Sequence, residues 1–81
     1  MKQDKRNELV ARITKHSQKK EEYANLIQEA EVNIKQLSTK TDENARMAVY
    51  NYQKIQETCT EAIEICDHII ADAEEILNEQ D

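Results

Sequence analysis

The chain has 81 residues, among them no glycine, proline, tryptophan or phenylalanine, and its net charge at pH 7 is −6. Average composition would place about ten glycines and prolines in a chain of this length. Because tight hairpins, phosphate-binding loops and left-handed caps usually need those two residues, their absence argues against sandwiches, barrels, dinucleotide-binding folds and nucleophile elbows, and it favours an all-helical chain.

An amphipathic helix is predicted over residues 4–37. Its core positions recur at alternating spacings of four and three residues, a seven-residue repeat that is typical of coiled coils. His16 and Lys20 are the polar residues of this repeat, and we expect them to fix the register of the helix pair. The predicted core positions are Leu9, Ile13, His16, Lys20, Tyr23, Ile27, Ala30, Ile34 and Leu37.

The repeat is interrupted at residues 38–43, which we predict to form a turn. Serine, threonine, aspartate and asparagine are frequent in residues 38–44, and these residues favour turns and helix caps. Thr41, followed by Asp42 and Glu43, is typical of a helix start, where acidic side chains oppose the positive end of the helix dipole. The alternative is one continuous helix whose repeat slips by four residues, since no glycine or proline forces a break.

A second helix is predicted over residues 43–79. Pairing positions whose numbers sum to 82 sets a large residue against a small one in most layers, as in Leu9 with Ala73 and Tyr23 with Cys59. The predicted core positions are Ala45, Ala48, Tyr52, Ile55, Cys59, Ala62, Cys66, Ile69, Ala73 and Ile76.

Charge favours the same antiparallel pairing. Residues 1–40 carry nine Lys/Arg and six Asp/Glu, a net charge of +3, whereas residues 41–81 carry two and eleven, a net charge of −9. A hairpin lays the basic helix along the acidic one, while a parallel dimer of straight helices would set like charges side by side. A straight antiparallel dimer would share this register, but only a hairpin also uses the turn residues where they stand, so we favour the hairpin.

The second helix has a wider apolar surface than one partner helix covers. A row of apolar residues lies beside its predicted core, and we expect an isolated hairpin to leave this row in water. This favours a homodimer of two hairpins in a four-helix bundle, with docking of a helix from a different protein as the alternative. The row comprises Val49, Ile63, Ile70 and Leu77, with Val10 and Ala24 on the matching side of the first helix.

Met47 and Tyr50 are predicted to lie outside both core stripes, close to the turn. A tyrosine beside a methionine is a reasonable protein-contact patch when both are exposed. We therefore keep this turn-end patch as a second candidate interface.

The sequence contains no pattern for catalysis, for a cofactor or for a metal ion. Two packed helices offer no cleft, and most acidic residues of the second helix fall on positions that we expect to be solvated. His16 should lie level with Cys66, with Cys59 and His68 nearby, but no CxxC or HxxxH spacing supplies a zinc-binding set. We therefore expect no enzymatic activity, no cofactor and no metal.

Cysteine usage and hydropathy predict a cytoplasmic protein. Cys59 and Cys66 are seven residues apart, about 10.5 Å along a helix, which is too far for a disulfide within one chain. Reduced thiols fit a cytosol-like compartment, with an intermolecular disulfide as the alternative. We also expect no membrane span and no secretory signal, because long apolar stretches are missing.

Nucleic acid is the alternative partner. The first twenty residues hold seven Lys/Arg and two acids, and the candidate phosphate contacts are Lys5, Arg12, Lys15 and Lys19. The acidic second helix would offset their field, with Arg12 near Asp72, so charge complementarity within the hairpin is the favoured interpretation.

The hairpin architecture, the opening Met1-Lys2-Gln3-Asp4-Lys5 and the segment from Ile65-Cys66 to Ala73-Glu74-Glu75 resemble the plasmid repressor-of-primer proteins. This resemblance implies a dimeric four-helix bundle that binds paired RNA loops. The apolar stripes of the first helix depart from that family, and the chain is longer, so the resemblance is an analogy of architecture. Small secretion chaperones and phage-encoded inhibitors also use helical hairpins.

Together these features predict one helical domain over residues 1–81 that acts as a small non-enzymatic protein-interaction module. A regulator, inhibitor, chaperone or assembly subunit would fit this description. An RNA-binding hairpin dimer that uses the basic first helix is the alternative function.

Overall fold

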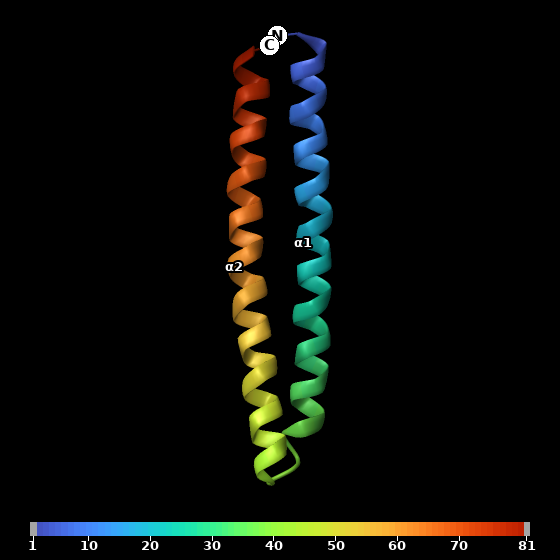
Figure 1. The fold of residues 1–81 in the computed structure, drawn as a ribbon, viewed down its shortest axis with the longest axis vertical. Helices are drawn as coiled ribbons and strands as arrows, with labels where there is room; N and C mark the ends of the chain where they lie inside the picture. The colour runs from blue at the N-terminus through green and yellow to red at the C-terminus, as the bar shows by residue number, and fades with distance from the viewer. Residues whose placement is uncertain (1, 81) are drawn as a thin grey trace.

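A computed structural model describes residues 2–80 and shows two long antiparallel helices joined by a short turn (Figure 1). Helix α1 spans Gln3–Leu37 and helix α2 spans Glu43–Gln80, so each bound lies within one residue of its predicted position. The chain is therefore an all-α helical hairpin, and the continuous helix is excluded.

The turn forms without any left-handed residue, because no described residue has a positive φ angle. The backbone N–H of Ser38 donates to the Ile34 carbonyl at 2.9 Å, and that of Lys40 donates to the Leu37 carbonyl at 3.0 Å. Asp42 then caps α2, since its Oδ1 accepts the backbone N–H of Ala45 at 3.2 Å. Polar side chains and backbone bonds thus replace the glycine that usually ends a helix.

The core is a narrow line of residues between the two helices. The buried apolar residues all come from the predicted core positions, and within each helix they are separated by multiples of seven residues. Leu9 and Ala73, predicted to share a layer, are 1% and 0% exposed, so the large residue fills the space that the small one leaves. The buried apolar residues are Leu9, Ala30, Ala45, Cys59, Cys66 and Ala73.

Beside this central line, the predicted core of α2 is partly wrong. Ile55 and Ile76, predicted to be in the core, are 42% and 37% exposed. Gln56 turns inward instead, and its Nε2 donates to the Ile27 carbonyl at 3.2 Å. Two rows flank the central line of α2: one lies four residues after it and contains Gln56, and the other lies three residues after it and contains Ile55. The row of Gln56 is therefore the one that lies over α1.

The reason lies in the symmetry of antiparallel helices. A local two-fold axis relates such helices, so the row four residues after the central line on one helix lies beside the equivalent row on the other. On α1 that row contains Ile13, Ile27 and Ile34, which are half-buried. The sequence-based pairing set it beside the opposite flank of α2.

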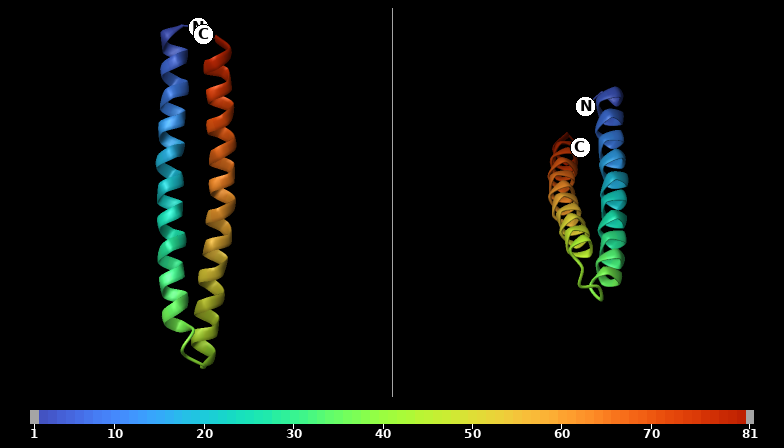
Figure 2. Two further views of the ribbon diagram at one scale, coloured as in Figure 1. Left: turned by 180° about the vertical axis from the view of Figure 1, so that it is seen from behind. Right: turned by 60° about the horizontal axis from the view of Figure 1, so that its bottom comes forward.

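The hairpin is a thin rod, with extents of 60 × 14 × 13 Å, and the start of α1 and the end of α2 lie at the same tip (Figure 2). Its radius of gyration is 18.2 Å, whereas a compact domain of this length would have about 12 Å. Its accessible surface is 6236 Å², about 1,200 Å² more than the roughly 5,000 Å² expected for a compact protein of this mass. The rod therefore leaves more of its surface in contact with solvent than a compact domain would.

Candidate protein interface

An exposed apolar edge runs along α2 on the flank opposite the row of Gln56. We call it the isoleucine edge. Ile55, Ile65 and Ile76 are 42%, 59% and 37% exposed, while Ile69 is half-buried. The edge is continuous because its residues, with Ala62 included, follow one another along α2 at spacings of seven, three, four and seven residues, which keep them on one side of a helix. It consists of Ile55, Ile65, Ile69 and Ile76, with the half-buried Ala62 between them.

Shallow depressions lie along this edge, and one of them is also lined by α1. One of them is bordered by Lys19 and Tyr23 of α1 and by Ala62, Ile65 and Ile69 of α2, together with His16 and Cys66. Another, almost entirely apolar, lies against Ile55 and Cys59, with Lys54 and Thr58. The edge therefore has relief that a second helix could fill with its own side chains.

The sequence reasoning missed Ile65. It lies outside both core stripes of the seven-residue repeat, so the sequence analysis assigned it to no interface. Its signal is its spacing, because it follows Ala62 by three residues and precedes Ile69 by four. Those spacings place it on the same face as residues that the repeat did select.

The predicted interface row sits in a different environment from the one expected. Val49, Ile63, Ile70 and Leu77 are all half-buried, because this row lies over the seam with α1. The expectation that an isolated hairpin leaves the row in water is wrong. Whether the row also contacts a further partner stays a prediction.

The other predicted contact residues are exposed but scattered. Val10 is 47% exposed, and Met47 and Tyr50 are each 59% exposed. The Lys54 ammonium lies 5.5 Å from the centre of the Tyr50 ring, a cation–π contact. Lys54 also pairs with Glu57 at 3.4 Å, so the surface around Tyr50 is polar on one side. These residues make a weaker patch than the isoleucine edge.

The basic residues of α1 lie on the flank that borders the isoleucine edge. Lys5, Arg12 and Lys19 are spaced seven residues apart and, like Lys15, are exposed. The expected pair of Arg12 with Asp72 is absent from the ion pairs among residues 2–80. Lys20 instead pairs with Asp67 across the helices, and both side chains are more than a third exposed. None of these four basic side chains takes part in an ion pair among residues 2–80.

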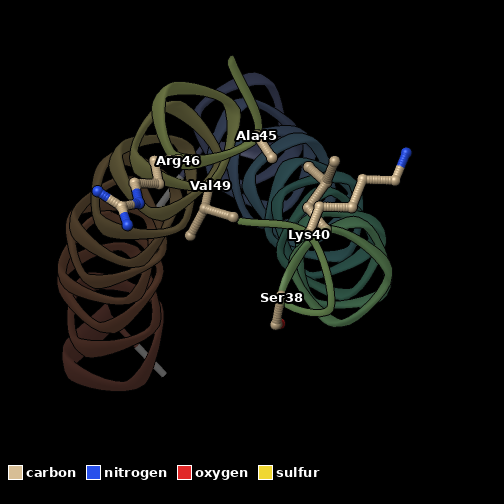
Figure 3. Close-up of a pocket in the computed structure, with 6 residues that line it drawn as sticks. Ser38, Lys40, Ala45, Arg46 and Val49 are labelled. Carbon is tan, nitrogen blue, oxygen red and sulfur yellow. The ribbon is translucent and has the colours of Figure 1, made fainter. Parts of the chain in front are cut away.

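The turn end carries a third depression, shown in Figure 3, between Leu37 of α1 and Val49 of α2. Its volume of about 240 Å³ is below the roughly 300–1,000 Å³ typical of ligand pockets. The cationic ends of Lys40 and Arg46 point to opposite sides, so they do not converge on one anion. This depression therefore has little to hold a small molecule.

The polar core residues are engaged in structural contacts. The His16 ring donates from Nδ1 to the Arg12 carbonyl at 2.9 Å. Cys59 and Cys66 are buried free thiols. Over residues 2–80, no three His, Cys, Asp or Glu side chains come together in a group that could hold a metal ion. In the same range, neither helix combines the length and the hydropathy that crossing a membrane requires.

Comparison of the chain with known protein families, with curated proteins and with solved structures finds no match. Any assignment of function therefore depends on the surfaces described above.

Proposed function

We propose that this chain is a non-enzymatic protein-interaction module of the cytoplasm that packs the isoleucine edge of α2 against a helix of another polypeptide chain. One observation carries the proposal: in a chain with 35% charged residues, Ile55, Ile65 and Ile76 remain exposed on one flank of α2. Contiguous apolar surface of this kind marks interaction sites in soluble proteins.

The shape of the molecule supports this mode of action. Two helices without a cleft cannot enclose a substrate, whereas a long apolar edge bordered by charges is what helix-in-groove recognition uses. A small regulator, inhibitor, chaperone or assembly subunit would need nothing more than such an edge.

Photo-crosslinking tests the proposal directly. A photo-reactive phenylalanine analogue replaces Ile65 on the edge in one variant and Glu64, which is exposed on the neighbouring face, in the control. Irradiation should give discrete protein adducts from position 65 and none from position 64. Absence of adducts at position 65, or equal adducts at both positions, would contradict the proposal.

RNA binding is the alternative function that would replace this proposal. The exposed basic row of Lys5, Arg12, Lys15 and Lys19 supplies phosphate contacts, but the acidic α2 lies alongside and opposes their field. In a gel-shift assay with a hairpin RNA at low salt, we expect no complex. A complex that is lost on Lys15→Glu with Lys19→Glu would favour RNA over a protein partner.

A further inference from the structure

The apolar row of α2 that supplies most of the isoleucine edge is close to palindromic. It reads Ala48, Ile55, Ala62, Ile69, Ile76, with seven residues between successive members. Turned end for end about Ala62, the row sets Ile55 against Ile69, Ala48 against Ile76, and Ala62 against itself. The smallest residue thus lies at the centre, where it lets two helices approach closely, and a large residue meets a small one at each end.

The same flank of α1 is complementary to itself in charge. Arg12 and Lys19 lie toward the chain ends, while Glu22 and Glu29 lie toward the turn, and all four are exposed. Spacings of seven and three residues place them on one face. None of them takes part in an ion pair among residues 2–80. An antiparallel copy of α1 would set Arg12 opposite Glu29 and Lys19 opposite Glu22.

The two patterns have their centres at the same height. The sign of charge on α1 changes between Lys19 and Glu22, and the apolar row of α2 is centred on Ala62. Lys19 and Ala62 border the same depression, so they lie level across the hairpin. A single two-fold axis at this level therefore pairs the charges of α1 with those of a second α1 and the apolar row of α2 with that of a second α2.

Orientation follows from the charges. A parallel copy with α2 packed on α2 would bring the acidic ends of the two α2 helices together. An antiparallel copy sets the level of Asp72 against that of Tyr52, and so keeps the acidic ends at opposite tips. The surface to be covered is also sufficient, because the excess of about 1,200 Å² over a compact protein exceeds the roughly 800 Å² that each partner buries in a standard interface.

We propose that a second copy of this chain packs on the isoleucine edge, antiparallel, with the two-fold axis at the level of Ala62. Helix α2 then contacts α2 of the second copy, and α1 contacts its α1. This inference rests on the proposed function and names the partner that the edge receives.

Cysteine crosslinking tests the geometry. In a background with Cys59→Ala and Cys66→Ala, single cysteines are introduced as Ala48→Cys, Ala62→Cys or Ile76→Cys. Under mild oxidation, Ala62→Cys should form a covalent dimer, because the axis brings that position close to itself. Ala48→Cys and Ile76→Cys should each stay monomeric alone and should crosslink when mixed.

A parallel dimer would reverse this pattern, because Ala48→Cys and Ile76→Cys would each crosslink to themselves and not to one another. Failure of Ala62→Cys to crosslink would overturn the proposed axis. Glu57→Cys, exposed and away from the edge, reports random collision and should give no dimer.

Sedimentation tests the surface with two matched pairs of variants. Ile65 and Tyr50 are both 59% exposed, yet only Ile65→Lys should dissociate the dimer, with Kd raised about a hundredfold. Leu26 follows Lys19 by seven residues on the flank of α1 that borders the isoleucine edge, whereas Val10 lies on the other flank. The two are 44% and 47% exposed, and only Leu26→Lys should weaken the dimer. Helical circular dichroism confirms that each variant is folded. Equal effects within either pair would contradict the assignment.

Charge reversal tests the α1 contact. Arg12→Glu and Glu29→Arg should each weaken the dimer by roughly tenfold, and the double variant should restore it, because both partners of each pair are then exchanged. A double variant weaker than both single variants would exclude this pairing.

The outcomes separate this inference from the proposed function. A wild-type chain that remains at 9.5 kDa at about 100 μM overturns the second copy as partner, since a micromolar complex would be nearly saturated. If Ile65 then still gives an adduct with a different protein, the interaction module stands without the homodimer. If neither is seen, both proposals fail.

Discussion

Two aliphatic rows run along α2, one on each side of its central line, and they differ in how far the hairpin buries them. Val49, Ile63, Ile70 and Leu77 lie over the seam with α1 and are half-buried, whereas the isoleucine edge is largely exposed. Their compositions are similar, so hydrophobicity does not decide between them. The direction of the partner helix does, because antiparallel packing brings equivalent flanks together.

The largest effect should come from charging the half-buried row. Ile63→Lys with Ile70→Lys should lower the free energy of unfolding by about 3 kcal/mol, because two aliphatic side chains lose their contacts with α1. Ile55→Lys with Ile65→Lys, the matched change on the exposed edge, should alter the unfolding of the isolated hairpin by less than about 0.5 kcal/mol. Urea unfolding, followed by circular dichroism at a concentration low enough to dissociate any dimer, measures both.

The reverse result would be equally informative. If the Ile63/Ile70 variant kept a stable hairpin and lost only self-association, the row first inferred from sequence would be the interface. The isoleucine edge would then have no assigned role.

The central line of the core could be predicted because it does not depend on which flank meets the partner. Leu9 and Ala73 belong to the middle row of each helix, and both are buried as expected. The turn was predictable for a similar reason, since the capping residue Asp42 acts locally.

The flanks were not predictable from apolar spacing alone. Gln56 made the inner row look polar, and its amide finds partners only after α1 is in place, in the Ile27 carbonyl and in Glu31 at 3.2 Å. Ile55 made the outer row look like core. Composition therefore favoured the wrong row, and the geometry of the helix pair was needed to correct it.

A substitution at Gln56 should sharpen the difference between the rows. Gln56→Leu should raise the stability of the isolated hairpin by about 0.5–1 kcal/mol, because an apolar side chain completes the half-buried row and the Ile27 carbonyl can still bond within its helix. Thr58→Leu, beside Ile55 on the exposed flank, should leave that stability unchanged and tighten self-association. Thermal unfolding at low concentration and sedimentation at high concentration separate the two effects. Stabilisation of the isolated hairpin by Thr58→Leu would show that the edge is not free.

The smallest expected effect concerns the one ion pair that joins the helices among residues 2–80, Lys20 with Asp67. Both side chains are more than a third exposed, so solvent screens the pair, and Asp67→Asn should cost no more than about 0.5 kcal/mol. Asp72→Asn, an exposed acid without an ion-pair partner in that range, should cost nothing in the isolated hairpin. The difference between the two variants should shrink as salt is added in urea unfolding. A cost for Asp67→Asn of about 2 kcal/mol that survives high salt would mean that the pair is desolvated in solution, as it would be if a second chain covered the flank of Gln56 rather than the isoleucine edge. This small effect therefore tests, from the opposite flank, which side of α2 is left open.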